Sequence, residues 1–143
     1  MKTDKISKEH VYRHNINSIW NAISTAKEIT AWFIEADFKA EKGYQYTFTA
    51  SEEYDRMKIR GTVKEATPYT LVYTWILQDT DVETTVSWTL TETEAGTHLL
   101  LEHSGISGYE GETAVTMLGN YNQGWSDCIV ELAAHLKSTL HVG

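Results

Sequence analysis

The sequence predicts an α+β fold in which one antiparallel β-sheet packs against a long C-terminal α-helix, with two short helices near the N-terminus. Between Gly43 and Ile106, apolar residues recur at every second position, as in strands with one buried face. From about residue 112 to 139 they recur at every third or fourth position, as in an amphipathic helix. The expected strands follow one another through short turns, which favours antiparallel pairing.

The N-terminal segment predicts a strand followed by two short helices. Residues 5–14 alternate weakly, and Asn15 and Asn17 then offer capping side chains to a helix over residues 16–25. A second helix is expected over residues 27–33. The apolar residues that these two helices would bury are Ile19, Trp20, Ile23, Ile29, Trp32 and Phe33.

The central segment predicts five or six strands joined as sequential hairpins, after a polar stretch that reaches Gly43. One turn is expected around Pro68, one near Asp79 to Asp81 and one at Ala95-Gly96. The residues expected on inward faces include Tyr44, Tyr46, Phe48, Ile59, Val63, Leu71, Tyr73, Trp75, Leu77, Val82, Val86, Trp88, Leu90, Leu99, Leu101 and His103.

The last segment predicts one long helix lying across the apolar face of the sheet. Gly119 and Gly124 lie inside this helix, where each costs about 1 kcal/mol relative to alanine. They suggest a bend or a close approach of the backbone to the sheet. The residues that form the apolar stripe are Leu118, Tyr121, Trp125, Cys128 or Ile129, Leu132, Leu136 and Leu140.

Length, charge and cysteine content restrict the classes of function. A chain of 143 residues that is 41% hydrophobic can bury its own core, and we expect residues 1–143 to form a single domain. With 12 basic and 20 acidic residues, it is not expected to bind nucleic acid. The single cysteine, Cys128, favours a reducing compartment, and no apolar run approaches the ~18 residues of a membrane span, so a cytoplasmic location is expected.

The titratable residues offer no recognisable catalytic or metal-binding set, so we expect no metal and no cofactor. Glu131 and His135 stand one helical turn apart, where a solvated pair is expected rather than a metal site. Cys128 falls on the apolar helix stripe and is expected to be structural. His103 shares the alternation of Leu99 and Leu101, so it is either a hydrogen-bonded core histidine or a polar contact for a ligand.

Several short motifs, in this order, resemble the START-like (SRPBCC) superfamily, and within it the homologues of the activator of the heat-shock-protein-90 ATPase. The motifs are Ile19-Trp20, Trp32-Phe33, Lys42-Gly43-Tyr44, Gly61 to Pro68 followed by Leu71 to Trp75, Gly96-Thr97 before Leu99 to His103, and Gly124-Trp125. Ile16 stands where this family usually has proline at the first helical position, so the helix must rely on Asn15 as its cap.

The resemblance implies a helix-grip fold with a cavity for apolar molecules between the sheet and the last helix. We therefore expect a non-catalytic domain that binds a lipid-like or aromatic small molecule, although the same aromatic residues could form only a packed core. The expected cavity residues are Trp32, Phe33, Tyr46, Phe48, Ile59, Tyr73, Trp75, Trp88, His103, Leu118, Tyr121 and Trp125.

Two alternative functions follow from the same resemblance. The domain could modulate a chaperone ATPase through a basic strand face formed by Arg56, Lys58, Arg60 and Lys64, although a solvated sheet exterior would also explain these residues. It could instead be a cavity enzyme of the cyclase or hydrolase kind, for which the sequence shows no acid, base or nucleophile set.

Overall fold

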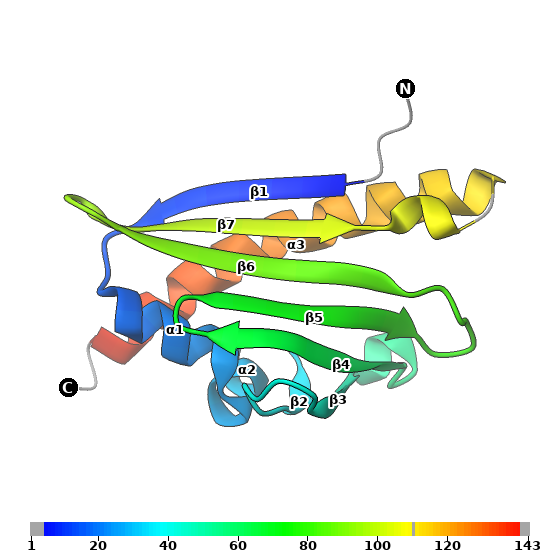
Figure 1. Ribbon diagram of the computed structural model, residues 1–143, viewed down its shortest axis with the longest axis horizontal. Coiled ribbons are helices and arrows are strands. Elements are labelled where there is room, and N and C mark those ends of the chain that lie inside the picture. Colours follow the sequence, from blue (N-terminus) through cyan, green and yellow to red (C-terminus); the bar gives the residue numbers. More distant parts are fainter. Residues whose placement is uncertain (1–4, 110, 141–143) are drawn as a thin grey trace.

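A seven-stranded antiparallel sheet forms one layer of the molecule, and a long helix crosses behind it (Figure 1). The computed structural model describes residues 5–109 and 111–140, with the side chains at 107, 111–115, 118 and 138–140 left undescribed. The two short helices lie together at one end of the long helix (Figure 1). This confirms the predicted helix-grip arrangement.

The elements follow in the predicted order, with two short 3-10 turns in addition. They are β1 (Lys5–Tyr12), α1 (Ile16–Ser24), α2 (Ala26–Trp32), β2 (Glu35–Asp37), β3 (Gln45–Thr49), η1 (Glu52–Tyr54), β4 (Lys58–Thr67), β5 (Thr70–Leu77), β6 (Thr84–Thr93), β7 (Gly96–Ser104), η2 (Ile106–Gly108) and α3 (Gly111–Leu140).

The sheet order is β1-β7-β6-β5-β4-β3-β2. Strands β2 to β7 pair with their neighbours in sequence, whereas β1 pairs with the last strand, β7, from Lys5 opposite Ser104 to Tyr12 opposite Thr97. The first strand therefore forms one edge of the sheet beside the last strand. The Tyr12 hydroxyl then donates to the Ile129 carbonyl at 2.9 Å, which ties β1 to α3.

Helix α1 begins at Ile16 as predicted, with Asn15 as its cap. The Asn15 side chain accepts a hydrogen bond from the Asn17 amide at 2.8 Å, so an amide side chain satisfies one of the free N–H groups of the first turn. Ile19 and Ile23 of α1 are buried, and the helix packs against the sheet and α3.

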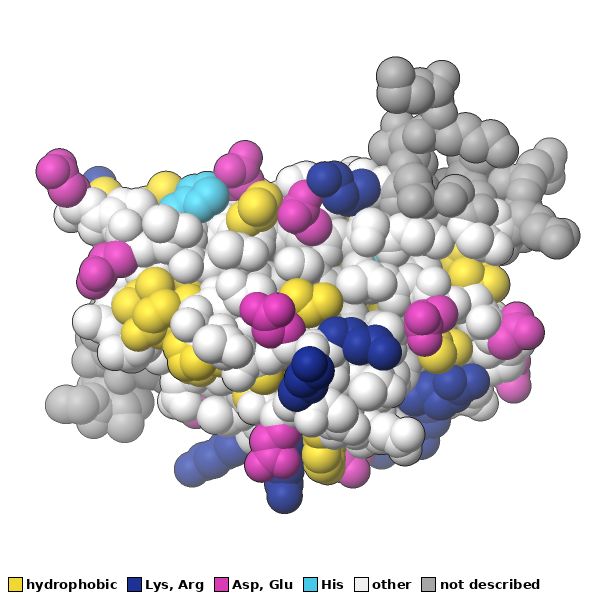
Figure 2. Space-filling view, in the orientation of Figure 1, with side chains coloured by type: hydrophobic (Ala, Val, Ile, Leu, Met, Phe, Trp, Pro, Cys, Tyr) yellow, Lys and Arg dark blue, Asp and Glu magenta, His cyan; other side chains and the backbone are white. Residues whose placement is uncertain are grey.

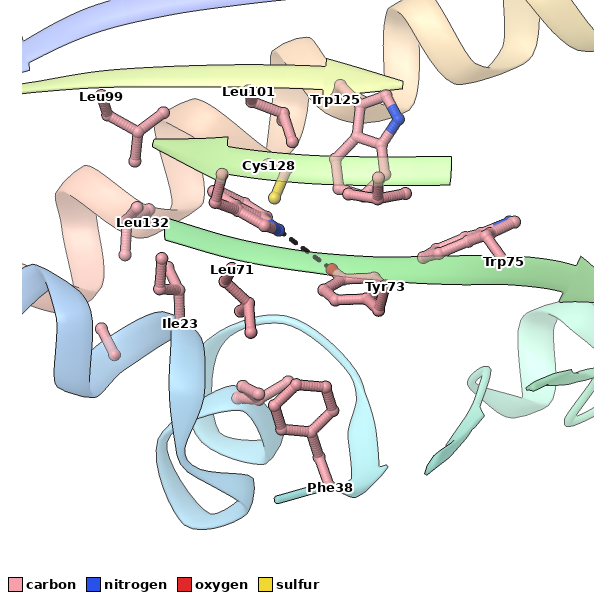
Figure 3. Packing of buried hydrophobic residues seen from close by; sticks show 14 of the residues in the cluster. Ile23, Phe38, Leu71, Tyr73, Trp75, Leu99, Leu101, Trp125, Cys128 and Leu132 are labelled. Carbon is pink, nitrogen blue, oxygen red and sulfur yellow. Dashed lines mark hydrogen bonds between the residues drawn. The ribbon is translucent and has the colours of Figure 1, made fainter. Parts of the chain in front are cut away.

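The buried core lies between the inward face of the sheet and α3. Alternation is strict along β7, where Leu99, Leu101 and His103 are buried and the residues between them are partly exposed. Cys128, Leu132 and Leu136 meet them from α3. Figure 3 shows this cluster, with Leu99 and Leu132 toward one end and Trp75 and Trp125 toward the other.

Two details of the sheet differ from the prediction. The extra strand β2 lies in the stretch that was predicted to be polar coil, because its three residues pair with β3 through the backbone and show no apolar alternation. Val82 was expected on a strand, but it lies in the loop before β6. This loop follows Asp79, whose positive φ of 66° turns the chain away from β5.

The expected close approach of α3 to the sheet at its two glycines is wrong. A Cβ atom built at Gly119 or Gly124 would meet no described atom within 4 Å beyond its own neighbourhood in the helix. Neither glycine is therefore required by packing of the helix on the sheet.

Candidate functional site

A pocket of about 180 Å³ lies where α3 crosses β4 and β5. Its walls expose only apolar atoms. Gly124 is itself exposed, so the pocket reaches the surface at this position. The lining residues are Phe33 and Ile34 after α2, Ile59 on β4, Trp75 on β5, and Tyr121, Gly124 and Trp125 on α3.

Four aromatic rings form most of this wall. The Trp75 and Trp125 ring centroids lie 5.4 Å apart with their planes at 60°, and Phe33 lies 5.8 Å from Trp125. Tyr121 meets Trp75 edge to face at 6.1 Å. The rings are inclined to one another rather than stacked in parallel. This arrangement leaves apolar ring surface facing the pocket.

The polar atoms of these rings are already bonded to the protein. Trp75 Nε1 donates to the Tyr121 hydroxyl at 3.1 Å, and Trp125 Nε1 donates to His103 Nδ1 at 2.9 Å. Burial raises the pKa of Tyr121, and the neighbouring Tyr109 hydroxyl adds to this effect. Both tryptophans therefore present carbon rather than N–H groups to the pocket.

His103 connects α3 to the sheet behind the pocket. Because an indole N–H can only donate, His103 Nδ1 must be the acceptor and Nε2 must carry the proton. Nε2 then donates to Thr84 Oγ1 at 2.7 Å, and Thr84 Oγ1 donates to the Trp75 carbonyl at 3.0 Å. The ring is completely buried, and burial lowers the pKa of His103 to about 4. His103 is a neutral, fully bonded core histidine.

The structure places the expected cavity residues in two groups. Phe33, Ile59, Trp75, Tyr121 and Trp125 line the pocket. The other described residues lie elsewhere: Tyr46, Phe48, Tyr73, Trp88 and His103 are packed in the core, and Trp32 is partly buried with Nε1 donating to the Ala22 carbonyl. The side chain of Leu118 lies outside those described.

The core group fills the space that a larger cavity would need. Tyr46, Phe48 and Tyr73 form a cluster whose ring centroids lie 4.6 to 6.1 Å apart. Trp88 donates to the Tyr73 hydroxyl at 3.0 Å, the hydrogen bond drawn in Figure 3. The pocket is confined to the end of the core at Trp75 and Trp125.

Sequence reasoning missed two lining residues, Ile34 and Gly124. Ile34 follows Phe33 at the start of a polar stretch and carries no periodic signal. Gly124 did stand out in the sequence, because glycine destabilises a helix interior and its presence there calls for a structural explanation. The reasons expected were a bend or a close approach to the sheet, whereas the structure shows open space at the Cβ position.

Comparison with known families identifies this fold. The family described as Activator of Hsp90 ATPase homolog 1-like protein matches residues 13–137. The chain belongs to this family. A comparison with curated proteins finds no match.

Solved structures of similar proteins share the fold of this Hsp90-activator-like domain. Protein MLL2253 from Mesorhizobium loti is 27% identical, with a TM-score of 0.84 over 94% of this chain and 98% of its own. Protein BH1534 from Bacillus halodurans is also 27% identical, with a TM-score of 0.77 over 94% and 97%. DynU16, from the dynemicin biosynthetic locus, is 20% identical and shares the fold, with a TM-score of 0.81 over 96% of this chain and 49% of its own.

The basic residues of this family member do not form the single strand face that was expected. Asp55 and Arg56 have positive φ values of 56° and 50°, so they form a turn, and β4 begins only at Lys58. Arg56 is paired with Glu35 at 3.1 Å. Lys58, Arg60 and Lys64 are exposed on β4, and Figure 2 shows basic side chains on this side of the molecule with acidic ones between them.

The remaining titratable groups are in structural contacts. Cys128 is buried as predicted, and burial raises the pKa of its thiol. The predicted Glu131 and His135 pair is wrong, because His135 bonds to Glu28 of α2 at 2.8 Å. Among the side chains that the structure describes, no group of three or more His, Cys, Asp or Glu could hold a metal ion. No helix in the described residues is long and apolar enough to cross a membrane.

Proposed function

We propose that this domain is a binding module that takes an apolar small molecule into the pocket beneath α3. The observation that carries the proposal is the wall of the pocket, which exposes only apolar atoms although two tryptophans and a tyrosine form much of it. Binding sites for small molecules are concave and mostly apolar. Burying apolar ligand surface there would contribute roughly 25 cal/mol per Å² removed from water.

The pairing of the polar groups supports binding rather than catalysis. The indole N–H groups of Trp75 and Trp125 are both bonded within the protein, and His103 lies behind Trp125 with both ring nitrogens occupied. A cyclase or hydrolase would need a general acid, base or nucleophile in reach of its substrate. In the described wall only the Tyr121 hydroxyl belongs to these classes, and it accepts from Trp75 while burial raises its pKa, so a cavity enzyme is the less well supported alternative.

Two tryptophan variants would test this proposal. Trp75 and Trp88 are both buried and both donate to a tyrosine hydroxyl, but only Trp75 lines the pocket. Titration of apolar aromatic and fatty ligands, followed by intrinsic tryptophan fluorescence, should show saturable binding that weakens several-fold in Trp75→Phe and little in Trp88→Phe. Absence of saturable binding to the wild type, or equal weakening in both variants, would count against the proposal.

A chaperone partner is a second proposal, favoured by the exposed cations Lys58, Arg60 and Lys64 on an otherwise acidic chain. Exposed cations can steer and orient a partner of the opposite charge. The family name points to the Hsp90 ATPase as the partner to test. A solvated strand surface would have the same appearance, so only a functional measurement separates the two.

Charge reversal on β4 tests this second proposal. The double variant Arg60→Glu with Lys64→Glu should abolish any stimulation of Hsp90 ATPase activity with little change in melting temperature, since exposed charges contribute little to stability. Lys27→Glu with Lys137→Glu makes the same change in net charge at exposed positions on α2 and α3 and serves as the control. Equal stimulation by both double variants, or none by the wild type, would remove this proposal.

A further inference from the structure

Gly124 has no side chain, and it lies on α3 between Tyr121 and Trp125, which also line the pocket. Glycine is among the residues that destabilise a helix interior most, because it loses the most backbone freedom. A Cβ atom at Gly124 would meet no described atom within 4 Å, so packing on the sheet does not require glycine here. A longer side chain at this exposed, pocket-lining position would occupy the opening.

The volume of the pocket limits the size of its occupant. The pocket measures about 180 Å³. Apolar cavities of about 150 Å³ hold one benzene molecule, and pockets for drug-sized ligands begin at roughly 300 Å³. The space bounded by protein therefore suits a single ring with a small substituent, and most of a long acyl chain or a fused polycyclic compound would lie outside it.

The chemistry of the wall limits the charge and polarity of the occupant. Aromatic rings also attract cations, and four of them line this pocket. However, none of the seven lining residues is acidic, so the wall offers a cation no counter-charge. Because the indole N–H groups of Trp75 and Trp125 are already bonded, neither offers a free donor to a hydrogen-bonding ligand.

We propose that the pocket selects one uncharged, apolar ring of about benzene to toluene size, and that Gly124 is the specificity-determining residue that keeps the opening free for it. This rests on the proposed binding function and adds the class of ligand and the residue that sets its size. For a ligand of so few atoms, the dissociation constant is expected on the order of 10 to 1,000 μM.

The experiment compares Gly124→Leu with Gly119→Leu. Both glycines are exposed on α3 and both have open space at the Cβ position, but only Gly124 lines the pocket. Leucine is a better helix former than glycine, so both variants should fold and melt no lower than the wild type. Isothermal titration calorimetry of each protein would use toluene, 1-decanol and tetramethylammonium chloride as probes.

Toluene is expected to bind the wild type and Gly119→Leu with dissociation constants within about twofold of each other, and Gly124→Leu at least tenfold more weakly. The two larger or charged probes are expected to give no saturable heat with the wild type. Tighter binding of 1-decanol or tetramethylammonium than of toluene would overturn the ligand class. Undiminished toluene binding by Gly124→Leu would overturn the role of Gly124.

The wild-type series depends on no variant, so it decides the ligand class even if Gly124→Leu does not fold. In that event Gly124→Met, with its flexible side chain, replaces it for the test of the opening. If none of the probes binds the wild type, this inference fails together with the proposed function. If 1-decanol alone binds, the binding function stands and only the inference about ring size fails.

Discussion

At the scale of single residues, His103 shows how a polar group is kept in an apolar core. Both of its ring nitrogens are bonded, one to Trp125 on α3 and one to Thr84 on β6. The Trp125 bond requires an unprotonated Nδ1, so it is lost when the ring becomes charged. The tryptophan that lines the pocket is thus held by a histidine that must stay neutral.

This arrangement predicts that acid destabilises the domain through His103. The folded pKa of about 4 lies below the ordinary value of 6.5, so the unfolded chain binds the proton first as the pH falls. Stability is present in full above about pH 6.5 and is lost as the pH falls toward 4, by up to about 3 kcal/mol. Urea unfolding at pH 7 and pH 4.5 would measure the loss.

His103→Gln provides the control, because an amide can accept from Trp125 and donate to Thr84 without titrating. The other histidine contacts, His98 with Glu9 and His135 with Glu28, remain in this variant. The difference in pH dependence between the two proteins therefore reports on His103. The same loss of stability on acidification in both proteins would contradict the assigned role.

At the scale of elements, the start of α1 rests on one side chain. Asn15 caps a helix whose first residue is Ile16 rather than a conformationally restricted proline. Asn15→Ala should therefore lower the free energy of unfolding by about 1 kcal/mol, while Asn15→Asp should keep most of it. Urea denaturation midpoints would measure both, and an unchanged midpoint for Asn15→Ala would show that packing alone fixes the helix start.

At the scale of the whole molecule, the sequence predicted the arrangement of elements better than the pocket. The period of the apolar residues located the strands and α3, because burial of one face determines that period. β2 has no such period and was missed, and Arg56 was assigned to a strand because the pattern does not reveal the left-handed turn at Asp55 and Arg56.

Whether aromatic residues fill a space or line one cannot be predicted from alternation. Tyr46 and Trp75 both point inward from neighbouring parts of the sheet, yet Tyr46 is enclosed by other rings and Trp75 borders the pocket. The difference depends on how side chains interlock, which is a matter of packing in three dimensions. Gly124 suggested a bend or a close approach to the sheet, and the open space at its Cβ position became clear only from its surroundings.

The most direct test of the binding function is to follow the indole N–H signals of the five tryptophans by NMR while toluene is added. Trp75 and Trp125 line the pocket, whereas Trp88 lies in the core and Trp20 packs against Tyr69 outside it. The signals of Trp75 and Trp125 are predicted to shift saturably and together, with much smaller shifts for Trp88 and Trp20. Shifts of equal size for all tryptophans, or no saturable shift for Trp75 and Trp125, would contradict binding in this pocket.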